Sequence, residues 1–225
     1  MSYSITFTTR EGGVSEGPFA SLNLGLLTDD DPGRVDENRR LLCRRVGADH
    51  ARLAMNRQVH GSAFNRAVAG RRGTPGDGLW TDEPRLPLLV LAADCLPIAL
   101  ARTSGSAALA LLHAGRVGLL EGIVEAGVAV LGEGELEATV GPGIGACCYE
   151  VGDEVADAYR RRFGSGILAG RRLDLRGVAH RLLEEGGVAR IEHVEACTAC
   201  DEPRYFSHRR DGPRTGRQGA IAYIS

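Results

Sequence analysis

Two apolar runs in the middle of the chain constrain the fold more than any other feature. The first covers residues 86–100 and is interrupted at Asp94 and Cys95, with strand signals on both sides of the interruption. The second covers residues 107–112 and predicts another buried strand, which ends at His113. Runs this apolar are typical of strands that are covered on both faces, so we expect them at the centre of a layered protein.

An amphipathic helix follows the second run. Apolar residues recur with the helical period of 3.6 residues over residues 117–131. The order along the chain is therefore a strand, the candidate ligand His113, Gly115 and a helix. This order is expected when a functional site lies at the carboxyl end of a strand.

The rest of the chain mixes helix and strand patterns. Asp31 followed by Pro32 predicts a helix start, and Gly47 predicts its end. Further strands are predicted over residues 3–8, 53–59, 63–68, 137–140, 190–196 and 219–224, further helices over residues 153–163 and 174–185, and loops or turns over residues 10–30 and 70–78. We therefore expect one domain over residues 1–225 with an α/β or α+β fold, a layered sandwich of mixed β-sheet flanked by helices.

Charge and composition exclude several classes of function. The net charge is -2 and the pI is about 6.3, so nothing attracts the whole chain to nucleic acid or to anionic membranes. All 27 cationic side chains are arginine, which excludes a Walker A lysine and a lysine Schiff base. We expect small-molecule partners, and any bound anion must be held by arginine, backbone amides or a metal.

The first residues show neither a basic region nor an apolar region of an export signal. The longest apolar run, residues 86–93, is far too short to span a bilayer. We therefore expect a cytoplasmic protein, in which the six cysteines are reduced.

Three separated positions offer ligands for a transition metal. His60, Cys95 and His113 together provide two imidazoles and one thiolate. Such a set fills three corners of a zinc tetrahedron and leaves the fourth for water or substrate, as in catalytic zinc sites. Asp94 or Gln58 could orient these ligands by hydrogen bonding.

The metal and its role are separate questions. Two histidines and a cysteine also form the equatorial set of blue-copper sites, which use a long axial methionine, and this chain has only Met1 and Met55. Zinc is therefore favoured over copper. Without a metal, Cys95 and His113 could form the thiolate–imidazole pair of a cysteine hydrolase or transferase, but His60 would then have no role.

Other motifs give weaker signals. Arg39 lies on the first predicted helix, and the tail contains a group of five arginines, namely Arg204, Arg209, Arg210, Arg214 and Arg217. The glycine-rich segment 141–145 departs from the dinucleotide fingerprint, because its third glycine comes one residue early. Cys197-x-x-Cys200 is a single pair with no second pair downstream, so we expect little metal or redox chemistry from it.

Taken together, the motifs of the chain resemble those of the laccase-domain family, which is variously called multicopper polyphenol oxidoreductase or purine nucleoside phosphorylase and includes the peptidoglycan editing factor. The resemblance lies in Ser21-Leu22-Asn23-Leu24-Gly25, Glu37-Asn38-Arg39, Gln58-Val59-His60-Gly61, Ala93-Asp94-Cys95-Leu96-Pro97, His113-Ala114-Gly115, Gly141-Pro142-Gly143-Ile144-Gly145, Tyr149-Glu150-Val151-Gly152, Cys197-Thr198, and Phe206-Ser207 through Gly216-Arg217. One departure is Arg116-Val117-Gly118, where the family usually has Trp-Arg-Gly.

The resemblance implies a zinc ion bound by His60, Cys95 and His113. It implies phosphorolysis of purine nucleosides such as adenosine, inosine, guanosine and methylthioadenosine, with adenosine deamination as a companion activity. It also implies a fold related to bacterial toxin deamidases that use a cysteine and a histidine. Nucleoside and phosphate are then the expected partners, with no nucleic acid or membrane, and the expected state is a monomer or weak homodimer.

Roles for individual residues follow as hypotheses. We expect catalytic roles for Cys95, His113, Arg39 and Asp94, and substrate contacts from Asn23, Gln58 and Arg209. Arg39 and Arg209 would neutralise phosphate, and Asp94 or Glu150 would be the general acid. A hydrolase that edits peptidoglycan precursors, a copper polyphenol oxidase and a non-enzymatic binding module remain as alternatives.

Overall fold

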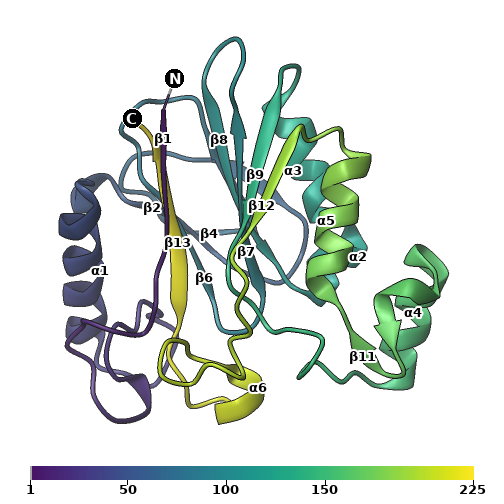
Figure 1. The fold of residues 1–225 in the computed structure, drawn as a ribbon. Helices are drawn as coiled ribbons and strands as arrows, with labels where there is room; N and C mark the ends of the chain where they lie inside the picture. Colours follow the sequence, from purple (N-terminus) through teal and green to yellow (C-terminus); the bar gives the residue numbers. More distant parts are fainter. Residues whose placement is uncertain (1) are drawn as a thin grey trace.

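Two β-sheets stacked face to face form the centre of the protein, and helices cover the outer faces of both (Figure 1). The structure is a computed structural model that describes residues 2–225. The fold class expected from the sequence is confirmed, although the strands divide between two mixed sheets.

The first sheet has five strands. Their order is β1 (Tyr3–Phe7), β13 (Gln218–Ile224), β6 (Leu88–Ala92), β2 (Ala54–Arg57) and β4 (Arg72–Pro75). Strand β2 runs parallel to both of its neighbours, and the other pairs are antiparallel. The first and last strands of the chain are therefore neighbours.

The second sheet has six strands. Their order is β12 (Arg190–His193), β9 (Leu136–Val140), β7 (Leu96–Arg102), β8 (Ala108–Ala114), β5 (Gly78–Thr81) and β3 (Phe64–Arg66). The two edge pairs are parallel and the inner pairs are antiparallel. A short pair, β10 (Leu168–Ala169) and β11 (Arg172–Leu173), lies outside both sheets.

Helices pack on both outer faces (Figure 1). Helix α1 lies against the five-stranded sheet, and α2, α3 and α5 lie on the side of the six-stranded sheet. The helices are α1 (Pro32–Val46), α2 (Arg116–Glu121), α3 (Ile123–Leu131), α4 (Asp153–Phe163), α5 (Leu175–Glu185) and α6 (His208–Asp211), with short 3-10 turns at Gly17–Phe19, His50–Arg52 and Ser165–Ile167. Within residues 2–225, none of the helices combines the length and the apolarity needed to cross a membrane.

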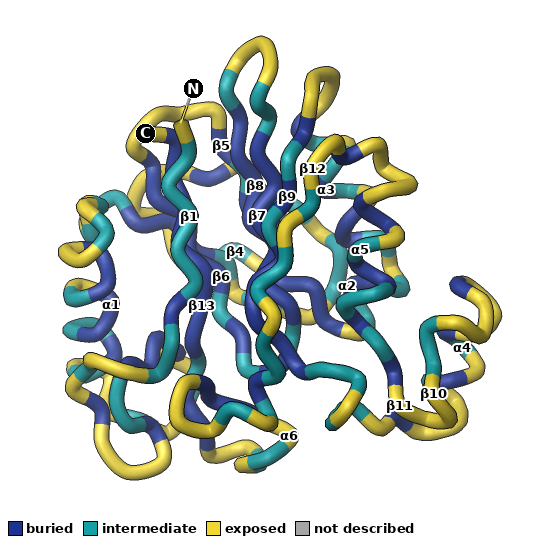
Figure 2. Tube along the Cα trace, viewed as in Figure 1, coloured by how far each residue is buried: buried dark blue, intermediate teal, exposed yellow. Residues whose placement is uncertain are grey.

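Alternation along the strands separates the layers of the core. In β6, Leu88 and Val90 point between the sheets, whereas Leu89 points toward α1. In β8, Leu109 and Leu111 face the same inter-sheet layer. This follows from the two-residue period of a strand, and Figure 2 shows the resulting buried centre.

Local differences from the sequence expectation have physical reasons. The helix predicted over residues 117–131 is two helices, because Gly122 has a φ of 92° and breaks the helical hydrogen bonding between α2 and α3. Strand β8 continues through His113 rather than stopping before it. The turn-rich stretch 70–78 contains β4, whose arginine, glycine and proline composition hides its strand character.

Candidate metal centre

The three candidate metal ligands converge at one end of the sandwich. His60 follows β2, Cys95 lies where the chain passes from β6 to β7 and so from one sheet to the other, and His113 lies near the end of β8. One donor atom from each residue lies within 4.8 Å of the others. The two imidazole rings meet edge to face with centroids 4.9 Å apart. The convergence expected from the sequence is therefore present.

Asp77, which the sequence analysis missed, organises this centre. Its carboxylate is fully buried and accepts the backbone N–H groups of Val59, His60 and Gly61 at 2.9–3.1 Å. These bonds hold His60 in a left-handed conformation with a φ of 64°. The loop with the first ligand is thus fixed by a single buried carboxylate.

The same carboxylate orients the third ligand. Oδ1 of Asp77 lies 2.8 Å from Nδ1 of His113, which must be the donor because an ionised carboxylate can only accept. The Nε2 atom of His113 is then free for a metal, as in the carboxylate–histidine–zinc arrangement. Burial acts to raise the pKa of Asp77, but the hydrogen bonds from His113, Gly61 and Val59 lower it below its usual value.

The surroundings of Cys95 favour the thiolate form of its side chain. Burial opposes its ionisation, but the charges and hydrogen bonds of His113 and His60 lower its pKa to about 6. Burial likewise opposes the charge on His113, while Cys95 and Asp77 raise the pKa of that imidazole to about 9. A negatively charged sulfur between two imidazoles fits a divalent transition metal.

Gly115 gives the sulfur its space. A Cβ atom at this position would lie 2.9 Å from the Sγ atom of Cys95. The backbone of Gly115 is extended, with a φ of -87°, so the requirement for glycine comes from close approach alone. This explains the glycine after His113 and Ala114.

Asp94, next to Cys95 in the sequence, connects three segments by hydrogen bonds. Oδ1 accepts from the buried Thr198 hydroxyl at 2.7 Å, and Oδ2 accepts from the backbone N–H of Arg209 at 2.7 Å. Asp94 therefore ties the β6–β7 connection to the loop after β12 and to α6. The orienting hydrogen bond to a ligand comes from Asp77 instead.

A cavity of about 1110 Å³ opens at the three ligands. Most of its charged lining is cationic: Arg39, Arg57, Arg72, Arg116, Arg209 and Arg217 line it, against Asp36 and Asp94. Its apolar lining includes Leu26, Leu27, Met55, Leu91 and Val117. The volume is slightly larger than that of most ligand pockets, about 300–1000 Å³, and the charge favours an anionic ligand.

Two expected phosphate binders, Arg39 and Arg209, line this cavity. Arg39 donates two hydrogen bonds to the carbonyl of Leu24, at 2.9 and 2.7 Å, and burial lowers its pKa to about 10. Arg209 donates to the carbonyl of Glu150 at 2.8 Å, and its guanidinium lies 4.9 Å from the ring centroid of Tyr149. Both guanidinium groups are therefore held in place before any ligand binds.

Asn23, an expected substrate contact, instead stabilises a loop beside the cavity. Asn23 is fully buried, and its amide bonds to Thr28, Asp30 and the backbone of Gly25 and Arg217. This network positions the loop and Arg217 rather than exposing the Asn23 amide to a ligand.

Gln58 and Glu150 are also engaged. Gln58 lines the cavity but pairs with both backbone groups of Leu91, at 2.7 and 2.8 Å, as an additional strand residue would. The carboxylate of Glu150 is on the surface in an ion pair with Arg171. Of the two general-acid candidates, Asp94 is the one whose residue lines the cavity.

The departure from the resembled motif lies at the cavity. Arg116 begins α2 and lines the cavity together with Val117, while its carbonyl accepts from the Tyr159 hydroxyl at 2.7 Å. An arginine is therefore still present in this wall. The glycine-rich segment 141–145 packs closely against β7, since a Cβ at Gly143 would lie 2.5 Å from Leu96.

Comparison with known proteins agrees with this arrangement. A family model described as multi-copper polyphenol oxidoreductase laccase matches residues 4–225. A protein of Pseudomonas aeruginosa named purine nucleoside phosphorylase PA4543 is 38% identical, over 96% of this chain and 91% of its own length. The Streptomyces coelicolor purine nucleoside phosphorylase SCO2081 is 39% identical, over 97% and 94%. The crystal structure of the Bacillus licheniformis hypothetical protein YfiH superposes with a TM-score of 0.93 at 32% identity, covering 99% of this chain and 93% of that one.

Proposed function

The chain belongs to the multi-copper polyphenol oxidoreductase laccase family, and from this membership and the site we propose that it is a zinc-dependent purine nucleoside phosphorylase. Its substrates would be adenosine, inosine, guanosine and methylthioadenosine. Relatives named purine nucleoside phosphorylase at 34–39% identity over most of their length support an enzyme of this kind.

The observation that supports phosphorolysis most directly is the set of arginines around the His60, Cys95 and His113 centre. Phosphorolysis brings an inorganic phosphate to the anomeric carbon, forms a new C–O bond there and breaks the bond to the purine nitrogen. The two negative charges of the phosphate need cations that are already in place. Arg39 and Arg209 are held by backbone carbonyls and meet that need without reorganisation.

The metal site fits zinc. His60, Cys95 and His113 would hold the ion, with Asp77 fixing two of these ligands from behind. When bound, zinc would supply Lewis-acid polarisation of an oxygen in the cavity. Two nitrogens and one thiolate, with one position left for a small ligand, are a set that catalytic zinc sites use.

The purine would leave toward the wall formed by Tyr149. Tyr149 lines the cavity, and burial raises the pKa of its phenol, so the hydroxyl stays protonated at neutral pH. It could therefore donate a hydrogen bond to the departing purine nitrogen. Asp94 remains a candidate for the general acid, but its carboxylate already accepts two hydrogen bonds.

The apolar part of the lining would cover the base. Leu26 and Leu27 are 48% and 83% exposed at the mouth of the cavity. Such apolar surface is suited to the face of a purine ring. The ribose would then lie between these residues and the arginines.

The experiment is product analysis with purified protein, inosine and phosphate. The expected result is hypoxanthine and ribose 1-phosphate in equal amounts, with no cleavage when phosphate is left out. We expect Arg209→Ala to raise the KM for phosphate about tenfold or more, because a charge-assisted contact is lost. Arg44→Ala, on the exposed side of α1 and paired with Glu37 outside the cavity lining, is the matched control and should leave the KM for phosphate unchanged. Cleavage at the same rate without phosphate would contradict the proposal.

Adenosine deamination is the proposed companion activity. Water in place of phosphate, directed at the C6 carbon of the base, would give inosine and ammonia. Incubation of adenosine without phosphate should therefore release ammonia. If no ammonia is released while phosphorolysis proceeds, only the proposed deaminase activity is contradicted.

One observation favours a second candidate, a cysteine hydrolase that edits peptidoglycan precursors. Cys95, His113 and Asp77 have the nucleophile, base and orienting acid of a hydrolytic triad. This candidate predicts phosphate-independent amide cleavage of muropeptides by metal-free protein. Polyphenol oxidation predicts instead that activity follows copper content.

A further inference from the structure

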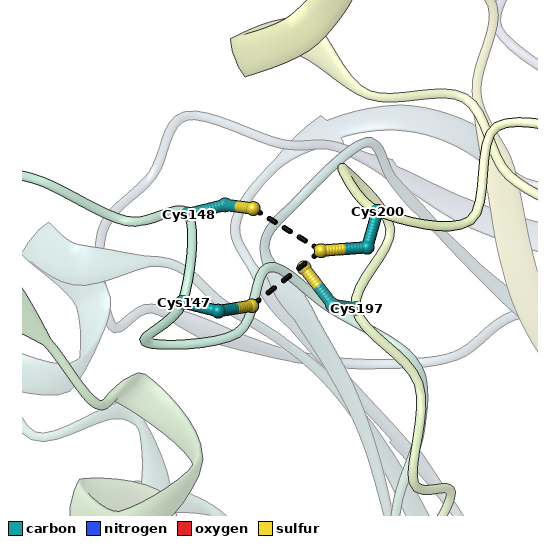
Figure 3. Close-up of side chains that lie close together, drawn as sticks. All are labelled: Cys147, Cys148, Cys197 and Cys200. Atoms are coloured by element: carbon teal, nitrogen blue, oxygen red, sulfur yellow. Dashed lines mark hydrogen bonds between the residues drawn. The ribbon is translucent and has the colours of Figure 1, made fainter.

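Four cysteine side chains, none of which belongs to the His60, Cys95 and His113 centre, lie close together (Figure 3). Cys147 and Cys148 are adjacent in the segment between β9 and α4, and Cys197 and Cys200 follow β12. One sulfur from each lies within 4.8 Å of the others. No second pair lies downstream of Cys197-x-x-Cys200, but the structure places it beside Cys147 and Cys148, which are upstream in the sequence.

The spacing of the sulfurs is that of a ligand shell. A zinc ion with four Zn–S bonds of about 2.3 Å holds its sulfurs about 3.8 Å apart at the corners of a tetrahedron. The Sγ atom of Cys200 lies 3.3 Å from that of Cys148 and 3.6 Å from that of Cys147. A disulfide would need about 2.05 Å and would use two of the four sulfurs.

We propose that Cys147, Cys148, Cys197 and Cys200 bind a second zinc ion, which is structural. All four coordination positions are protein sulfurs, so no position is open for substrate. This site is independent of the proposed phosphorylase activity, because it shares no ligand with the catalytic centre.

The backbone around the cluster is arranged for thiolates. The N–H of Gly145 donates to the sulfur of Cys197 at 3.2 Å, and such hydrogen bonds stabilise metal-bound sulfur. A Cβ at Gly145 would lie 3.2 Å from the sulfur of Cys147 and 3.3 Å from the Cβ of Cys197. Glycine therefore lets the two cysteine segments approach each other.

Three arginine side chains are hydrogen-bonded to backbone carbonyls of the two cysteine segments. Four thiolates and one zinc ion leave a net charge of about -2, which needs nearby positive charge. Three arginines donate to carbonyls in the two cysteine segments: Arg209 to Cys148 at 3.3 Å, Arg210 to Thr198 at 2.9 Å and to Ala199 at 3.3 Å, and Arg176 to Ala196 at 2.7 Å. Arg176 and Arg210 also pair with the carboxylates of Glu195 and Asp211, so their bonds to the carbonyls mainly fix the two cysteine segments. Arg209 is held there by carbonyl oxygens and adds a positive charge beside the segment of Cys148.

A zinc ion bound to the four cysteines would stabilise one wall of the cavity. Cys148 precedes Tyr149 in that wall, and Cys197 precedes Thr198, whose hydroxyl holds Asp94. An ion bound to both segments would fix these two side chains without touching a ligand in the cavity. Loss of the ion should lower stability and loosen Arg209, which is held against the same segment.

The test is the zinc content of purified protein prepared under reducing conditions, measured by elemental analysis with protein quantified in the same sample. We expect two zinc ions per chain in the wild type and one in Cys200→Ser. Cys95→Ser should also lose one ion, from the other centre, and the double variant should hold none. Cys43→Ala, at the only cysteine outside both groups, is the matched control and should keep two.

A second measurement avoids substitutions in the four-cysteine cluster, so it does not depend on whether such a variant folds. Cobalt-substituted wild type should show strong thiolate-to-metal absorption, and Cys95→Ser should keep most of it, because four of the five metal-bound sulfurs lie in the cluster. One zinc per chain in the wild type with no change in Cys200→Ser would overturn the proposal. So would iron with inorganic sulfide, or mass spectrometry showing a disulfide between the two segments in reduced preparations.

Discussion

At the scale of single residues, the positions of His60 and His113 depend on the buried carboxylate of Asp77, which lies outside the proposed set of metal ligands. His60, Cys95 and His113 could be selected from the sequence, because each ends a short segment with a recognisable ligand and turn pattern. Asp77 could not, because its link to His113 is made by the pairing of β5 with β8, which places Gly78 opposite Leu112. A single sequence does not reveal that long-range register.

Asp77→Asn tests this dependence. One carboxylate oxygen becomes an NH₂ group, which cannot accept the backbone N–H groups that Asp77 now accepts. We expect zinc affinity at the centre to fall about 10–100-fold, as for other residues that orient metal ligands. Competition with a chromophoric chelator measures it, and Asp82→Asn on the surface is the control. Unchanged affinity in a folded Asp77→Asn protein would refute the role given to Asp77.

Gly115→Ala tests the space beside the thiolate. The added methyl would lie 2.9 Å from the Cys95 sulfur, so either the sulfur or α2 must shift. We expect weaker metal binding and at least tenfold lower activity, with little change in thermal stability. Gly166→Ala adds the same methyl group in open space and should be neutral. Equal metal affinity in both variants would show that the close approach is unimportant.

At the scale of elements, cap residues and apolar runs in the sequence predicted where individual helices and strands form. Helix α1 begins where Asp31 and Pro32 predict it and ends at Gly47, which has a φ of 69°. The apolar runs became β6, β7 and β8. The division into two sheets was not predictable, because it depends on pairings such as β1 with β13, between the two ends of the chain.

The N-terminal cap of α1 should contribute measurably to the stability of the protein. The Asp31 carboxylate accepts the backbone N–H of Arg34 at 2.9 Å. We expect Asp31→Ala to reduce the free energy of unfolding by about 1 kcal/mol, the usual effect of removing such a cap. Urea denaturation measures the change. Asp31→Asn keeps an accepting oxygen and should lose much less, so equal losses would argue against the capping role.

At the scale of the whole molecule, the two proposed metal sites lie where strands of different sheets or distant segments end together. Strands β9 and β12 are parallel neighbours, so the segments that follow them leave the sheet on the same side and bring the cysteine pairs together. The proposed ligands of the catalytic centre come from both sheets, because His60 follows β2 of one sheet, His113 lies in β8 of the other, and Cys95 lies on the crossing between them. The sandwich therefore positions both sites through its topology, which motif spacing alone does not reveal.

We propose that His60, Cys95 and His113 form one zinc centre that performs phosphorolysis. The most direct test of this proposal compares wild type with Cys95→Ala for hypoxanthine release from inosine, with zinc added and phosphate varied, while ribose 1-phosphate is measured in parallel. We expect phosphate-saturable release in the wild type, equal amounts of both products, and at least a hundredfold loss in Cys95→Ala. Undiminished release by Cys95→Ala, or release without ribose 1-phosphate, would contradict it.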